Sequence, residues 1–310
     1  MSHGSDMTPD YLDGALLSGD GVMPSAAKLV KLTKSKVKTV RKFEKYASAL
    51  IGSPLSSSYL AAKPFVSIFS VGRVCQALKP EETHPVNAPV FANQSFRLLH
   101  VPSHAPGKGT AEIEEIIINL KRKGFNIIYH CLSGVPNAQV LKAIKECDLV
   151  VDQLYADLPM SGLACEAAFL GKPTILCGYE LTALKSLVPS KRFPPTLICH
   201  PRNLEKEIEA LIGEPTRLYS QGQQLSHFVN TVWNPAAVAR RYLVLIDNEP
   251  IPGDWIHDPR VLVNLCGYGL SSARTMSNLQ QIIGLYGIRG LCLAHRPDLE
   301  KAFSQLLKHD

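Results

Sequence analysis

Turns rich in small residues, in the middle of the sequence, carry side chains that could hold phosphate. One of them, at positions 104–110, places Lys108 between two glycines shortly after His104. Small residues at a helix start let backbone amides approach an anion, and a lysine ammonium group adds a point charge beside it. We therefore expect Ser103, His104 and Lys108 to form one side of a phosphate site.

A second turn leads into a helix that carries a carboxylate. Glu166 lies about one turn after Ser161 and Gly162, within the apolar stretch Leu-Ala-Cys-Glu-Ala-Ala-Phe-Leu. An acid near a helix start often only complements the helix dipole. A carboxylate among small apolar residues, however, needs a polar partner to offset its desolvation, and ribose hydroxyls would supply one. We expect the amides of Ser161 and Gly162 to face phosphate and Glu166 to bind ribose.

A third turn, formed by Ser133, Gly134 and Val135, follows another apolar run and is expected where the base of a nucleotide would sit. The runs before these turns alternate with segments of helical periodicity, the pattern of a parallel sheet with crossover helices. The fold class predicted is therefore α/β, a Rossmann-like doubly wound parallel sheet, with its site at the carboxyl ends of the strands. The predicted strands occupy positions 97–101, 126–132, 149–154, 174–177 and 195–199.

The sequence predicts three regions. Positions 1–45 combine a mobile start (1–25) with a basic helical segment, and positions 46–247 hold the nucleotide-binding domain. Within that domain, 64–69 reads as a strand, 71–93 as a proline-rich loop, and Thr110 as the N-cap of the first helix. Positions 248–310 form a C-terminal extension with helices at 271–286 and 297–308.

Composition limits the classes of protein. The chain has 310 residues, 45% of them hydrophobic and 19% charged, as in globular proteins. Neither a signal peptide nor an apolar run near 18 residues is evident, so a cytoplasmic location is expected.

The eight cysteines are scattered without a CxxC pair, which favours buried free thiols. His100, His104 and His130 lack metal-ligand spacing, so neither a metal nor a bound cofactor is expected.

The net charge of +6 is concentrated at positions 28–45, which hold eight Lys or Arg residues and one Glu. The simplest interpretation is a solvated helix face. The alternative is contact with an anionic membrane surface, at the inner face of a membrane, or with an acidic partner. Nucleic acid is disfavoured as a partner because no aromatic residues alternate with the basic ones.

Positions 46–245 resemble the C-terminal, donor-binding half of a retaining GT-B glycosyltransferase of the glycosyltransferase 4 (group 1) type. The motifs that carry the resemblance are Ser-His-Ala-Pro-Gly-Lys-Gly-Thr, Leu-Ser-Gly-Val-Pro, Asp-Leu-Val-Val-Asp-Gln-Leu and, most specifically, the stretch 162–173. The resemblance implies that Glu166 binds the ribose of a nucleotide sugar and that Lys108 contacts its diphosphate. It also implies transfer of the sugar with retention of configuration.

Two positions depart from the family pattern. Leu158, beside Asp157, stands where a second glutamate is usual, and Ser103 and His104 stand where an arginine accompanies the lysine. Only positions 1–45 precede the matched region, so an acceptor-binding half is expected from a partner chain or a second copy. The alternatives are a noncatalytic nucleotide-sugar-binding or scaffold protein, and another nucleotide- or phosphosugar-binding enzyme such as an epimerase. A dinucleotide enzyme is disfavoured because no Gly-x-Gly-x-x-Gly turn is present.

Overall fold

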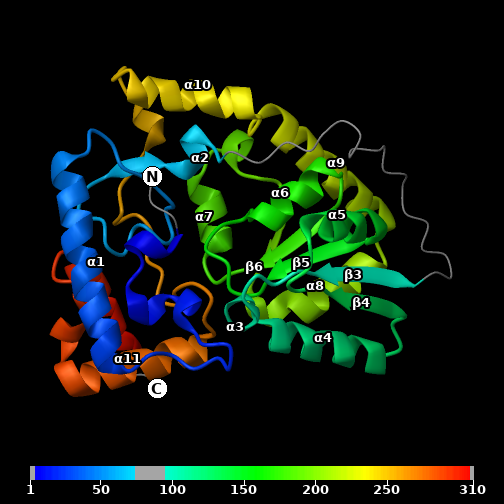
Figure 1. Ribbon diagram of the computed structural model, residues 1–310, viewed down its shortest axis with the longest axis horizontal. Helices are drawn as coiled ribbons and strands as arrows, with labels where there is room; N and C mark the ends of the chain where they lie inside the picture. Colours follow the sequence, from blue (N-terminus) through cyan, green and yellow to red (C-terminus); the bar gives the residue numbers. More distant parts are fainter. Residues whose placement is uncertain (1–3, 74–94, 308–310) are drawn as a thin grey trace. The chain divides into compact units, whose positions relative to one another are not determined.

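The computed structural model describes residues 4–73 and 95–307 (Figure 1). The contacts within the chain define two compact units, which we call the sheet unit (Gly72–Arg240) and the terminal unit (Met1–Val71 with Arg241–Asp310). Residues 46–71, which the sequence assigned to the nucleotide-binding domain, are grouped with the chain ends. Most of the predicted loop at 71–93 lies outside the described residues.

The sheet unit contains five parallel strands in the order β4-β3-β5-β6-β7. The predicted run 174–177 coincides with one strand, and the other four runs differ from the observed strands by one or two residues at their ends. The chain begins at β3, moves outward to β4 and then crosses back to β5, so the direction of winding reverses between β3 and β5. The strands are β3 (Phe96–His100), β4 (Ile127–Cys131), β5 (Leu149–Gln153), β6 (Thr174–Cys177) and β7 (Leu197–Cys199).

Helices cover both faces of this sheet, as the doubly wound fold requires (Figure 1). Alternate residues of β3 face opposite sides: Leu98 joins the core formed with α4 and α8, and Leu99 joins the core formed with α5 and α6. The predicted fold class is confirmed. The helices are α3 (Ala105–Lys108), α4 (Thr110–Arg122), α5 (Asn137–Glu146), α6 (Gly162–Phe169), α7 (Leu181–Leu187), α8 (Leu204–Ile212) and α9 (Pro215–Thr231), followed by α10 (Pro235–Ile246), which continues into the terminal unit.

The terminal unit combines a small mixed sheet with helices from both chain ends. Strand β2 pairs with β1 in parallel and with β8 antiparallel. The predicted strand at 64–69 is shorter than expected, because the chain turns into α2 after three strand residues. The elements are α1 (Ala26–Tyr46), β1 (Ile51–Gly52), β2 (Phe65–Ser67), α2 (Ile68–Val71), β8 (Ile256–His257), α11 (Ser272–Tyr286) and α12 (Pro297–Leu306).

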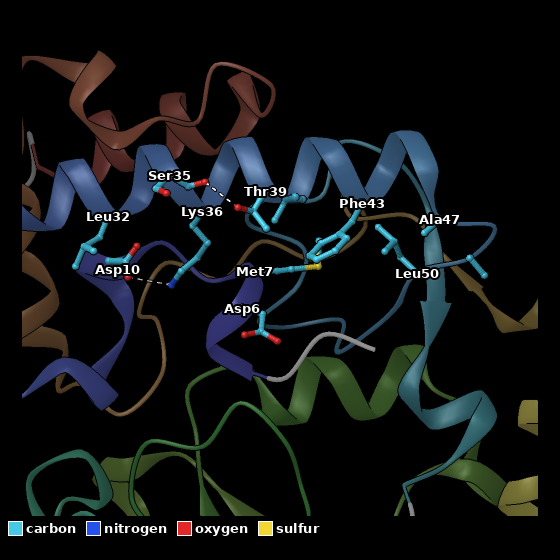
Figure 2. A pocket seen from close by; sticks show the side chains of 12 residues that line it. Asp6, Met7, Asp10, Leu32, Ser35, Lys36, Thr39, Phe43, Ala47 and Leu50 are labelled. Carbon is cyan, nitrogen blue, oxygen red and sulfur yellow. Dashed lines mark hydrogen bonds and ion pairs between the residues drawn. The ribbon is translucent and has the colours of Figure 1, made fainter.

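The prediction of a mobile segment at 1–25 is wrong for much of it. Tyr11 and Leu12 are completely buried in the core of the terminal unit. The Tyr11 hydroxyl donates to the Leu291 carbonyl at 2.9 Å, and Lys36 pairs with Asp10 at 3.0 Å (Figure 2). Beside this pair, the N-terminal segment and α1 line a cavity of about 560 Å³.

The cysteines follow the predicted pattern only in part. Within the described residues six are free thiols, of which Cys147, Cys177 and Cys199 are buried and Cys131 is exposed. Cys165, on α6, is disulfide-bonded, so the expectation of a free thiol is wrong there.

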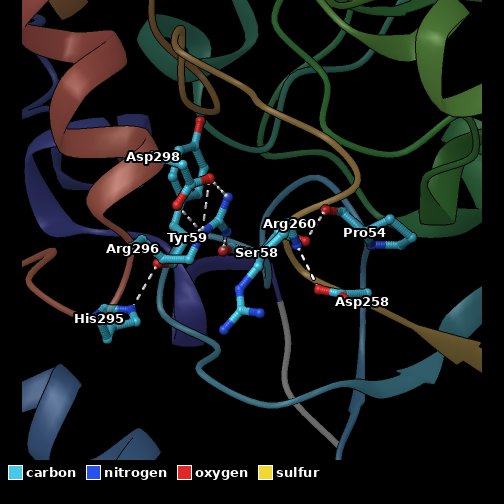
Figure 3. Close-up of polar contacts among 8 residues, drawn as sticks. All are labelled: Pro54, Ser58, Tyr59, Asp258, Arg260, His295, Arg296 and Asp298. Carbon is cyan, nitrogen blue, oxygen red and sulfur yellow. Dashed lines mark hydrogen bonds and ion pairs between the residues drawn. The ribbon is translucent and has the colours of Figure 1, made fainter.

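The terminal unit holds two histidines whose burial makes its stability depend on pH. Burial is the largest of the causes that lower the pKa of His257 and of His295 to about 4, and the charge of Arg296 acts on both in the same direction. A ring nitrogen of His295 lies 3.1 Å from the Tyr59 carbonyl, and the buried Arg296 binds Asp298 and the Ser58 carbonyl (Figure 3).

An unfolded histidine has a pKa of about 6.5, so the unfolded chain binds more protons than the folded one between pH 6.5 and 4. Stability should be complete above pH 6.5 and fall as the pH approaches 4. Both rings are partly exposed to solvent, which reduces the effect. We therefore expect the free energy of unfolding to fall by about 1–2 kcal/mol per histidine by pH 4.5. Urea unfolding at several pH values across this range measures the change. In His295→Gln, the free energy of unfolding should depend less steeply on pH. An unchanged slope in that variant would contradict the assignment.

Candidate nucleotide-binding site

The carboxyl ends of β3 and β5 form the topological switch point of the sheet, where ligands bind in open α/β folds. Two of the three predicted turns follow strands at this edge directly, and the third precedes α6. Ser133 Oγ donates to the Pro102 carbonyl at 3.4 Å, which joins the turns after β4 and β3, and Leu154 N, directly after β5, donates to the Lys108 carbonyl at 3.0 Å. The structure therefore brings the predicted site residues to one edge.

The turn after β3 forms a single helical turn, α3, before α4 begins. His104 is extended, and its Nδ1 accepts the Gly107 amide at 3.2 Å, which caps α3. The amides of Lys108 and Gly109 are also paired inside the turn. The expectation that amides of this turn face phosphate is therefore wrong for these three residues. The ammonium group of Lys108 is the donor that the turn presents.

Thr110 is not the N-cap of the helix, contrary to the prediction. Gly109 takes that position with a left-handed backbone (φ 72°), and Thr110 is the first helical residue. The Thr110 hydroxyl lies 2.9 Å from Nε2 of the buried His100, whose Nδ1 lies 2.8 Å from the Val151 carbonyl. A carbonyl only accepts, so Nδ1 carries the proton and Nε2 accepts from Thr110. Burial lowers the pKa of His100, in keeping with this neutral ring.

Lys108 forms an ion pair with Asp152 of β5, at 3.2 Å. The two side chains are 13% and 1% exposed, and Asp152 Oδ2 has no hydrogen-bond partner among the described residues. A lysine can donate three hydrogen bonds, so this pair leaves Lys108 two donors for a ligand. Asp152 stands inside an apolar run of the sequence, and an acid in such a run is the signal that could have indicated a buried partner.

Helix α6 begins as the sequence predicts. Ser161 caps it by accepting the Ala164 amide at 3.2 Å, which leaves the first-turn amides of Gly162 and Leu163 outside the bonding of the helix. Glu166 is half-buried and finds a partner in Asn137, whose amide donates to Oε1 at 2.9 Å. This bond joins α6 to the start of α5, just after the turn that contains Val135.

The turn after β4 is exposed to solvent. Ser133 and Gly134 are exposed, Gly134 has a left-handed backbone (φ 67°), and Val135 packs on the core beside α5. Ser103, in the loop before α3, is exposed as well. Val135 and Leu163 of α6 pack against the same core.

Three aromatic side chains at the same edge were missed in the sequence. Each follows a strand: Tyr155 after β5, Tyr179 after β6 and His200 after β7. The rings of Tyr155 and Tyr179 stack at 6.0 Å, and His200 meets Tyr179 edge-on at 5.4 Å. Their position within two residues of a strand end was the available signal. Tyr155 is buried in the core with residues of α4 and α8, and Tyr179 packs against that core.

Gly109 is the residue of the turn that tolerates substitution least. A Cβ at this position would lie 2.7 Å from Leu154 Cβ, and φ lies in the left-handed region. We expect Gly109→Ala to lower the free energy of unfolding by about 2–4 kcal/mol, from backbone strain and overpacking. Urea denaturation measures this loss. Gly162→Ala is the control, since nothing lies within 4 Å of its Cβ; equal losses in both variants would contradict the prediction.

In comparisons with known proteins, no family model and no curated protein matches this chain. The likeness to GT-B glycosyltransferases stays a hypothesis from motifs. Over residues 4–73 and 95–307, no group of three or more His, Cys, Asp and Glu side chains could hold a metal ion. In the same residues, no helix has the length and hydropathy needed to cross a bilayer.

Proposed function

We propose that the sheet unit binds a nucleoside diphosphate or a nucleotide sugar at the carboxyl edge of its sheet. The observation that carries the proposal is the meeting of the three turns at the switch point, linked by the Ser133–Pro102, Lys108–Leu154 and Asn137–Glu166 hydrogen bonds. A cation, first-turn amides and a carboxylate stand there together. These groups suit phosphate and ribose hydroxyls respectively.

Each residue has a role in this proposal. Lys108 keeps its bond to Asp152 and donates its other protons to the diphosphate, and the amides of Gly162 and Leu163 face the same phosphates. Glu166 accepts hydrogen bonds from the ribose, with Asn137 fixing its orientation. The open turn at Ser133 and Gly134 leaves room for the base.

We further propose that the protein is the donor-binding part of a retaining glycosyltransferase, completed by an acceptor-binding partner or a second copy. Positioning of the acceptor supplies much of the rate in a transfer reaction, and none of the residues above is assigned to that task. Purification of the native complex and measurement of its mass would test this part. A stable monomer that transfers sugar by itself would overturn it.

Two observations favour the noncatalytic alternative. Lys108 is already neutralised by a buried carboxylate, and Leu158 stands where the family places a second glutamate. A nucleotide-binding scaffold needs neither a free cation nor that glutamate. Product analysis distinguishes the two: a new glycoside of unchanged anomeric configuration supports the transferase, whereas binding without turnover in the native complex supports the scaffold.

Hydrogen exchange tests the location of the proposed site. Addition of uridine or guanosine diphosphate should slow amide exchange at 133–137 and 161–166, where backbone groups face the ligand. Residues 181–187 and 204–212, on helices away from the turns, serve as the internal control. Protection confined to the control helices would place the ligand elsewhere and contradict the proposal.

A further inference from the structure

Helix α1 carries six lysines along one face. They recur at intervals of three or four residues, and all six are exposed, while Ala26, Leu29, Val30 and Val40 on the other side are buried. We call these six residues the lysine ridge. From first to last the ridge extends about 25 Å, at 1.5 Å per residue. Its members are Lys28, Lys31, Lys34, Lys38, Lys42 and Lys45.

No acid within the described residues forms an ion pair with the ridge. Two other cations of α1 are paired: Lys36 binds Asp10 (Figure 2), and Arg41 binds Glu44. Glu44 is the one acid in α1, and its side chain is only 3% exposed. It is held by Arg41 and by the Ala62 amide at 2.6 Å. The charge of the ridge is therefore available to an external anion.

Three ridge lysines surround a hollow. Lys31, Lys34 and Lys38 line a cavity of about 480 Å³, together with Ser35 and with Tyr286 of α11. Like charges gathered around one hollow repel each other, and an anion placed among them relieves that repulsion. A phosphate group is of suitable charge and size.

Exposed apolar side chains flank the ridge. Tyr46 is 75% exposed and follows Lys45, whose ammonium group lies 5.0 Å from its ring centre. Leu285 and Tyr286, at the end of α11, are 69% and 44% exposed. Lysines beside exposed aromatic and leucine side chains are typical of segments that lie at a lipid interface. A soluble polyanion would gain nothing from these apolar groups.

We propose that the lysine ridge binds the surface of an anionic lipid bilayer, with a lipid phosphate in the hollow between Lys31, Lys34 and Lys38. Tyr46, Leu285 and Tyr286 enter the interfacial layer beside it. This contact belongs to the terminal unit alone and does not depend on nucleotide binding.

Vesicle cosedimentation of the full chain tests the proposal. The protein should bind vesicles of phosphatidylcholine mixed with phosphatidylglycerol, bind pure phosphatidylcholine weakly, and lose binding as salt rises. Lys31→Gln/Lys34→Gln/Lys38→Gln should reduce partitioning on the order of a hundredfold, at roughly fivefold per lysine. The matched control, Lys121→Gln/Lys142→Gln/Lys145→Gln, removes the same charge from exposed positions of the sheet unit and should change partitioning little.

Two further arms separate lipid from other anions. Tyr46→Ser/Leu285→Ser should weaken vesicle binding but leave binding of soluble glycerol phosphate unchanged, because neither side chain lines the hollow. Circular dichroism confirms that each variant is folded. The proposal would be overturned if the two triple lysine variants lost vesicle binding equally, or if the protein showed no preference for anionic vesicles. It would also be overturned if polyglutamate or duplex DNA bound more tightly than anionic vesicles of equal charge.

Discussion

Replacement of Lys108 by methionine should lower the free energy of unfolding of the sheet unit by about 3 kcal/mol, because it leaves a buried carboxylate without its cation. Asp152 is 1% exposed, and its Oδ2 already lacks a partner among the described residues. Urea denaturation followed by circular dichroism measures the loss. Lys123→Met is the matched control, since that lysine pairs with Glu205 and Glu209 at the surface, and its loss should change stability little.

A second substitution separates stability from binding. In Lys108→Met/Asp152→Asn the buried charge is removed together with its partner, so most of the lost stability should return. Nucleotide affinity should not return, because the ammonium group that would face the diphosphate is still missing. A double variant that regains stability and binds nucleotide as tightly as the parent would show that Lys108 serves only the fold.

Glu166→Gln should weaken nucleotide binding roughly 10- to 150-fold, the effect of losing a charge-assisted hydrogen bond of about 1.5–3 kcal/mol. Its effect on stability should be small, because Glu166 is half-buried and Asn137, its partner, is exposed. Calorimetric titration of both proteins with one nucleoside diphosphate measures the difference.

The control for this substitution is Glu146→Gln, an exposed acid at the end of α5 in the same unit. It removes the same charge away from the three turns and should leave affinity unchanged. Equal weakening by both substitutions would mean that net charge, rather than a contact with ribose, carries the effect.

The sheet was predictable because its strands are short apolar runs between helical segments. Once the alternating strands and helices indicated an α/β fold, the position of the site at the carboxyl ends of the strands could also be predicted. Pairings between distant residues did not follow. Nothing local in the sequence indicates that Thr110 binds His100, or that Asp152 lies 3.2 Å from Lys108.

The N-terminal segment was misjudged for a related reason. Its glycines, serines and aspartates suggest mobility, but the buried Tyr11 forms hydrogen bonds with Asn278 and Leu291, which lie more than 260 positions away. Composition over a short window cannot show such a partner. Likewise, the row of Tyr155, Tyr179 and His200 becomes visible only when the strands that precede these residues are aligned.

Nucleotide binding by the sheet unit is measured by isothermal titration calorimetry of the full chain with uridine, guanosine and adenosine diphosphates and their sugar conjugates. We expect saturable binding of at least one of them, with one site per chain, weakened in both Lys108→Met/Asp152→Asn and Glu166→Gln. The absence of binding by every nucleotide in the panel, with a chain shown to be folded, would contradict the account.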